Sequence, residues 1–169
     1  MTGLQTVTLN GTNNFNYNVN GLLVLADGNI RINNLTASHN ANFGAMLDNW
    51  TNWYYGFGAP KGGSLTLTGF GTFTDNTGSD GLSAYSNGAI SLTRVTADFN
   101  GNGASDYGID IYSNSNVTLI CSGAYGNYDI GLYIDAAVNL TLKGFLAYAN
   151  GTNEDLTGVS GTITRTPCP

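Results

Sequence analysis

The feature that most constrains this chain is an internal sequence repeat. Four segments align without a gap, and each opens with Gly and closes with Asn: residues 21–40, 81–100, 108–127 and 131–150. The interval is 23 residues from Gly21 to Gly44 and again from Gly108 to Gly131. A fixed period of this size predicts a solenoid, in which each repeat forms one coil and buries its apolar face against its neighbours.

Within each segment, apolar residues alternate with polar ones over short runs. The first run of one segment contains Ile109 and Ile111, and after a turn the second run contains Val117 and Leu119. A third, weaker pair follows. A period of two is expected of a strand with one buried face. Three short strands per repeat predict an all-β fold, a right-handed single-stranded parallel β-helix of roughly six coils of about 23 residues.

The Asn that closes each repeat is expected to stack on its equivalents in neighbouring coils. One such residue occurs per coil: Asn40, Asn76, Asn100, Asn127 and Asn150. Parallel coils repeat at about 4.8 Å, and a primary amide at that spacing can bond the amides above and below it. We therefore interpret these residues as an internal ladder rather than as a binding site.

The chain is expected to form a single β-helix domain, residues 1–169, and to be a fragment of a larger exported protein. The N-terminal residues lack the basic and apolar regions of a signal peptide. Only 9% of the residues are charged, while Asn, Thr, Ser and Gly are abundant, a composition that we interpret as extracellular or cell-surface. Residues 49–63 form an aromatic-rich loop insertion that holds both tryptophans, Trp50 and Trp53.

Composition also excludes some partners. With a net charge of −6 and five basic residues, the chain has no cationic stripe to neutralise phosphates, so we expect no nucleic-acid binding. No apolar run approaches the roughly 20 residues of a membrane helix, so we expect no membrane insertion. The flanking domains of the parent protein are expected partners.

The repeat also carries a family resemblance. Its pattern is Gly-apolar-x-apolar, a turn, Asn-apolar-Thr-apolar and then Asn, and it covers residues 21–150. This pattern resembles the right-handed parallel β-helix repeat shared by pectate lyases, polygalacturonases and many bacterial surface proteins. The resemblance implies the fold, but it leaves the activity open because the same repeat occurs in enzymes and in non-catalytic proteins.

The polygalacturonase motifs match only in part. Asp80, just before Gly81, resembles the Asp of the Asn-Thr-Asp-Gly motif, and Asp106 and Asp129 precede the first strands of the next two coils. The His and the basic substrate clamp of that family are absent. The alternative function is therefore a polysaccharide-active glycoside hydrolase fragment in which Asp80, Asp106 and Asp129 act as acid and base. The competing interpretation is that Asp before Gly simply forms a turn.

Metal and cofactor sites are not expected. Pectate lyases resembling this repeat carry calcium-binding aspartates on the outward side of the second strand, where this chain has mainly Ser and Thr. Without clustered carboxylates a hard cation has no dedicated site there. A hydroxyl ladder also suits a flat hydrated plane such as an ice-binding surface, but Arg31, Ile120 and Lys143 interrupt it.

The outward side of the first strand is the predicted binding face. Three tyrosines and three aspartates share it: Tyr85, Tyr112, Tyr133, Asp48, Asp110 and Asp135. Aromatic rings beside carboxylates are the usual means of gripping a sugar chain. The expected partner is therefore a polysaccharide or glycan surface, bound by a non-catalytic module. The predicted ligand-binding set is Trp50, Trp53, Tyr85, Asp110, Tyr112, Tyr133 and Asp135. We expect both tryptophans and at least one of the tyrosines to form one exposed aromatic surface. The alternative is a solvated face on which the rings pack between coils.

Two smaller features remain open at this level. Two cysteines in an exported chain commonly pair, but Cys121 and Cys168 lie two coils apart, about 9 to 10 Å at ~4.8 Å per coil. Pairing therefore requires the C-terminal tail to curl back. His39 stands alone before the ladder Asn40, and we interpret it as a turn residue rather than a base or ligand.

Overall fold

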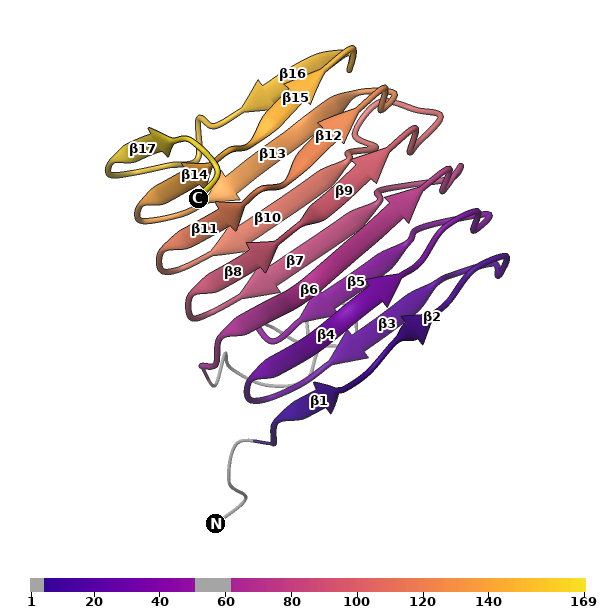
Figure 1. Cartoon of the computed structure of the whole chain (residues 1–169), viewed down its shortest axis with the longest axis horizontal. Coiled ribbons are helices and arrows are strands. Elements are labelled where there is room, and N and C mark those ends of the chain that lie inside the picture. The colour runs from indigo at the N-terminus through magenta and orange to yellow at the C-terminus, as the bar shows by residue number, and fades with distance from the viewer. Residues whose placement is uncertain (1–4, 51–61) are drawn as a thin grey trace.

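The protein forms a parallel β-solenoid of about 6 turns spaced roughly 24 residues apart, as seen in the computed structural model (Figure 1). The structure describes residues 5–50 and 62–169, and these ranges contain strands and turns but no helix. The prediction of an all-β parallel solenoid is confirmed. Most of the insertion predicted at residues 49–63, including Trp53, lies outside the described residues.

The first strands of successive coils form one six-stranded parallel sheet. Its strands lie side by side in the order β3, β5, β7, β10, β13 and β16, so the first strands of consecutive coils are neighbours in the sheet. The bounds are β3 Leu22–Leu25, β5 Ala45–Asp48, β7 Leu82–Ser86, β10 Ile109–Ser113, β13 Ile130–Ala136 and β16 Thr152–Asp155. One short strand per coil therefore builds this face of the solenoid.

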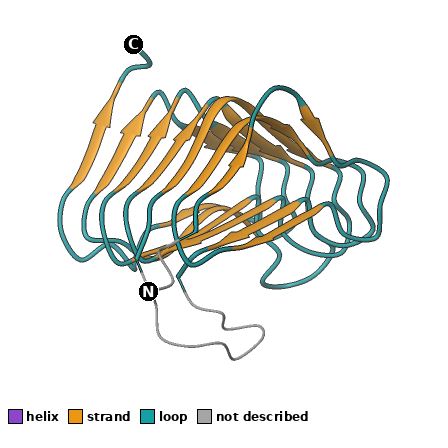
Figure 2. Ribbon diagram, turned by 90° about the horizontal axis from the view of Figure 1, so that it is seen from below, coloured by secondary structure: helices purple, strands orange, loops and turns teal. Residues whose placement is uncertain are grey.

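The second and third strands of the coils form an eleven-stranded sheet (Figure 2). In two coils these strands are continuous, as β4 and β6, whereas in the later coils they are separate. The bounds are β1 Val7–Leu9, β2 Asn13–Asn14, β4 Ile30–Thr36, β6 Leu65–Thr74, β8 Ile90–Thr93, β9 Val95–Asp98, β11 Val117–Ile120, β12 Gly123–Tyr125, β14 Leu140–Lys143, β15 Leu146–Tyr148 and β17 Ile163–Thr166.

The interior is a stack of the apolar residues that the period of two predicts. Ile109, Ile111, Val117 and Leu119 have no exposed surface, and their equivalents in the neighbouring coils are buried alongside them. Strand pairing keeps them in register, since Leu119 aligns with Leu92 on one side and with Leu142 on the other. Burial of this apolar stack is the main force that holds the coils together.

The predicted asparagine ladder runs inside the solenoid and is confirmed. Asn76 Nδ2 donates to Asn100 Oδ1 at 2.9 Å, and Asn100 Nδ2 donates to Asn127 Oδ1 at 2.9 Å. Both amides also donate to a backbone carbonyl of the preceding coil. The Gly that opens each coil packs on this ladder, because a Cβ on Gly108 would lie 2.5 Å from Asn127 Nδ2. Gly and Asn therefore recur together because each requires the other.

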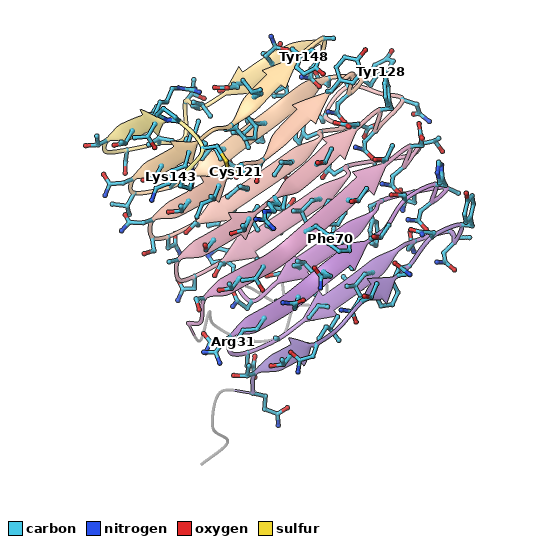
Figure 3. All side chains as sticks on the ribbon, in the orientation of Figure 1. Arg31, Phe70, Cys121, Tyr128, Lys143 and Tyr148 are labelled. Carbon is cyan, nitrogen blue, oxygen red and sulfur yellow. A yellow bond between two sulfur atoms is a disulfide. The ribbon has the colours of Figure 1, made fainter. Side chains whose placement is uncertain are left out.

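The two cysteines form a disulfide, which answers the question that the sequence leaves open. The Cα atoms of Cys121 and Cys168 are 5.3 Å apart (Figure 3). The tail returns directly over Gly144, where an added Cβ would meet the Cys168 Cβ at 2.4 Å. Gly144 also has a φ of +61°, so both the backbone conformation and the close approach of the tail favour glycine at this position. A glycine in the intervening coil lets the tail reach across two coil steps.

Candidate functional site

The candidate site lies on the outward side of the six-stranded sheet. We call it the acidic-aromatic face and define it by its described residues: Trp50, Asp80, Ser83, Tyr85, Tyr107, Asp110, Tyr112 and Tyr133. Strand register sets their order, because Asp110 of β10 aligns with Ser83 of β7 and with Tyr133 of β13. Tyr85 likewise aligns with Tyr112.

Outward residues on this face are more buried than simple alternation predicts. Ser83 has no exposed surface, and Asp48 and Asp110 are only 5% and 7% exposed. Tyr85, Tyr112 and Tyr133 are each partly exposed. The face is therefore neither a fully solvated sheet surface nor a core, and Asp48 and Asp110 are more buried than its tyrosines.

Trp50 extends the face at the end of β5. Its indole ring contacts Tyr112 with ring centroids 3.9 Å apart and an interplanar angle of 34°. Its backbone N–H donates to Asp48 Oδ1 at 2.8 Å, so the carboxylate that ends β5 holds the chain in place as it leaves the strand. The structure thus brings together Trp50 and one of the three predicted tyrosines, while Trp53 lies outside the described residues.

Asp110 is the most constrained carboxylate of the face. The Tyr85 hydroxyl donates to its Oδ2, while its Oδ1 is buried and has no hydrogen-bond partner. Burial raises the pKa of Asp110 to about 7, with a further contribution from the charge of Asp80. Burial and the Asp110 charge in turn raise the pKa of Tyr85, which keeps its phenol protonated as the donor.

Asp80 is linked to the strand position of Asp110 by Ser83, which aligns with Asp110 in the neighbouring strand and binds Asp80. The Ser83 hydroxyl donates to Asp80 Oδ2 at 2.8 Å, and the Tyr107 backbone N–H donates to Asp80 Oδ1 at 2.8 Å. Burial raises the pKa of Asp80 to about 6 despite these two hydrogen bonds. Neither carboxylate belongs to the ion pairs seen in residues 5–50 and 62–169, which join His39 to Asp75 and Arg165 to Glu154.

A second pair of rings adjoins this carboxylate pair. Tyr107 and Tyr133 have centroids 4.7 Å apart at an interplanar angle of 36°. Besides burial, the charge of Asp110 contributes to raising the pKa of each phenol, which places both rings near that carboxylate. Sequence alternation misses Tyr107 because it precedes the strand, but it occupies the position before the opening Gly that Asp80 holds in the preceding coil.

The other predicted carboxylates bind backbone at the same edge. Asp106 Oδ2 accepts hydrogen bonds from the N–H groups of Asn102 and Gly103, and Asp129 Oδ2 accepts one from Ser105. Asp106 also raises the pKa of Asp80 slightly, so the two lie near each other. The three aspartates of the hydrolase alternative therefore share an edge, and each of them accepts backbone hydrogen bonds in or near the turns.

Asp135 departs from the gapless alignment of the repeats. A β-bulge shifts the register after Ile111, so that Tyr112 pairs with Ala136 instead of Asp135. The extra residue leaves Asp135 exposed, at 3.4 Å from the Tyr133 hydroxyl. A bulge re-aims a side chain at the cost of a local break in the strand pairing.

Metal and membrane sites were also sought in the described ranges. No group of three or more His, Cys, Asp or Glu residues there is placed to hold a metal ion. The same part of the chain contains no helix that is long and apolar enough to cross a membrane.

Comparison with known proteins gives no further guide: the chain matches no protein-family model, no curated protein and no solved structure. The function proposed below is therefore argued from the acidic-aromatic face itself.

Proposed function

We propose that this chain is a non-catalytic β-helix module of a secreted or cell-surface bacterial protein, and that it binds polysaccharide on the acidic-aromatic face. The observation that carries the proposal is the Trp50–Tyr112 ring pair beside a buried carboxylate with a free oxygen. Partly exposed rings offer apolar surfaces to sugar C–H groups, and carboxylates accept hydrogen bonds from sugar hydroxyls.

The setting proposed for the module rests on the repeat and on the cysteines. The repeat resembles that of right-handed β-helix surface proteins of the pectate lyase-like kind, which suits a stalk or adhesin. A disulfide between Cys121 and Cys168 favours an oxidising compartment. The low content of charged residues agrees with an exported chain.

Titration of the chain with neutral oligosaccharides, including N-acetylglucosamine tetramer and cellotetraose, tests this function. We expect a shift in tryptophan fluorescence on binding. Trp50→Ala should weaken binding by a factor of about 30, since truncating an aromatic hot spot costs ~2 kcal/mol. Tyr148→Ala is the matched control, because Tyr148 is 57% exposed on β15, away from this face. Equal losses in the two variants, or no binding by the unaltered chain, would contradict the proposal.

Glycoside hydrolysis is the second candidate function, with Asp80, Asp106 and Asp129 as the acid and base. The observation that favours it is the pKa of Asp80, which burial raises to about 6, a value suited to a general acid near neutral pH. Reducing-sugar assays on pectin and xylan should stay at background for the module proposed above. Turnover that Asp80→Asn abolishes would instead establish the hydrolase.

A further inference from the structure

We propose that the acidic-aromatic face selects glycans that carry free amino groups, and that Asp110 and Asp80 together bind the sugar ammonium. This inference rests on the polysaccharide-binding function proposed above and specifies its ligand class. It makes unacetylated amino sugars the preferred ligands, ahead of neutral sugars and of uronates.

The first argument is the vacant hydrogen-bonding capacity of Asp110. The Tyr85 hydroxyl donates to one oxygen of this carboxylate and so fixes the orientation of the Asp110 side chain. The other oxygen is buried without a donor, and Asp110 as a whole is only 7% exposed. Buried polar atoms in folded proteins are nearly always paired, so Asp110 Oδ1 stands out as an unsatisfied acceptor.

The second argument is charge. Asp110 aligns with Ser83, whose hydroxyl donates to Asp80, so the Asp80 charge acts on Asp110. Neither carboxylate is paired with a cation in the described part of the chain. A neutral hydroxyl supplies one hydrogen bond, whereas an ammonium supplies three donors and also cancels the repulsion between the two carboxylates. The desolvation of both carboxylates has already been incurred in folding, so the cation gains more here than at a solvated carboxylate.

The third argument is the ring pair beside the carboxylates. Tyr133 aligns with Asp110 on the neighbouring strand, the Tyr107 ring packs on that of Tyr133, and both rings are partly exposed. Aromatic faces attract cations through their quadrupole. The same surroundings disfavour a uronate, because Asp135 adds another carboxylate at the exposed rim and like charges repel.

Protonation of the site gives the proposal a second readout. Asp110 faces Tyr85 from β7, Asp80 from the turn before β7, Tyr107 from the turn before β10, and Tyr133 and Asp135 from β13. An ammonium bound here lowers the pKa of Asp110 from about 7, so binding near neutral pH releases a proton. Because Asp110 must lose its proton to pair with the ammonium, the preference for amines should strengthen from pH 5 to pH 7.

Calorimetric titration of the full chain with two matched ligands, glucosamine tetramer and N-acetylglucosamine tetramer, tests the inference. The unaltered protein should bind the amine form about tenfold more tightly at pH 7, with a smaller preference at pH 5. The heat at pH 7 should depend on the buffer, because a proton is released. This comparison uses no variant, so it does not depend on any substitution folding.

Two substitutions locate the effect. Asp110→Asn should abolish the preference for the amine form, so that the ratio of the two affinities falls to about one. Asp75→Asn removes the same charge from a half-exposed residue that pairs with His39, and it should keep the preference. If both tetramers bind equally well to the unaltered chain, this inference is overturned and the polysaccharide-binding function stands. If neither tetramer nor a neutral glycan binds, both proposals fall.

Discussion

The two outward surfaces of the solenoid share one core but differ in how deeply their outward side chains are buried. On the six-stranded sheet, the outward residues Ser83 and Asp110 are buried. On the eleven-stranded sheet, the equivalent residues Ser91 and Thr118 are partly exposed and form a plain hydroxyl row. The period of two is the same in both. It therefore decides which residues enter the core, whereas the burial of outward residues depends on neighbours that alternation does not encode.

The largest expected effect comes from the core that both surfaces share. Ile111→Asp places a carboxylate in the fully buried stack, without a hydrogen-bonding partner. The cost of several kcal/mol is comparable to the whole stability of a domain, roughly 5 to 15 kcal/mol, so the chain should unfold. Circular dichroism and thermal melting check this, with the exposed Thr164→Asp on β17 as control. A native spectrum and unchanged melting in Ile111→Asp would contradict the account of the core.

A matched pair of substitutions tests the contrast between the two surfaces directly. Ser83 and Ser91 are both outward serines of the same coil, one buried and one partly exposed. Ser83→Asp would bury a third carboxylate between Asp80 and Asp110 and should cost several kcal/mol of unfolding free energy. Ser91→Asp should change stability by no more than about 0.5 kcal/mol. Equal effects in denaturant titrations would show that the two surfaces do not differ in burial.

Much of the fold follows from local regularities in the sequence. The opening Gly, the closing Asn and the alternating apolar residues predict the parallel coils, the buried stack and the internal ladder, because each depends only on the equivalent position one coil away. Such nearest-neighbour interactions repeat with the sequence period. The residues of the candidate face are only partly predictable in this way, since Trp50 reaches Tyr112 across the intervening strand β7.

Three properties of the site have no repeating signal. The bulge at Asp135 depends on how one coil accommodates an extra residue, and an alignment without gaps cannot register it. The burial of Ser83 depends on the surroundings of the sheet rather than on its pattern. The free oxygen of Asp110 depends on the direction in which the Tyr85 hydroxyl points. Each is a property of three-dimensional packing.

The acidic-aromatic face should also make stability depend on pH. The pKa of Asp110 rises from 3.8 to about 7 on folding, so its protonated form is favoured in the native state. This contribution is fully present below pH 3.8 and is lost as pH rises through about 7. The unfolding free energy should therefore fall between pH 5 and pH 8, by roughly 2 to 3 kcal/mol.

Asp110→Asn is the diagnostic variant for this pH dependence. Because the amide does not titrate, the variant should show a flatter profile and should exceed the unaltered protein in stability at pH 8. Urea denaturation at each pH measures both quantities. A profile as steep as that of the unaltered protein would assign the pH dependence to other groups.

Loss of the disulfide is expected to have the smallest effect on the acidic-aromatic face, because the bond lies at the turns and tail of the eleven-stranded sheet. Cys121 and Cys168 are separated by 47 residues in sequence, and closing a loop of this size typically stabilises a domain by ~2–4 kcal/mol. Cys168→Ser should lower the melting temperature accordingly. Because Trp50 contacts Tyr112 on the other sheet, its fluorescence and any glycan affinity should not change. Gly144→Val should also lower the melting temperature with both cysteines present, since the valine side chain would occupy the path of the tail over position 144. A change in Trp50 fluorescence on loss of the disulfide would show that the two surfaces are coupled through the core rather than independent.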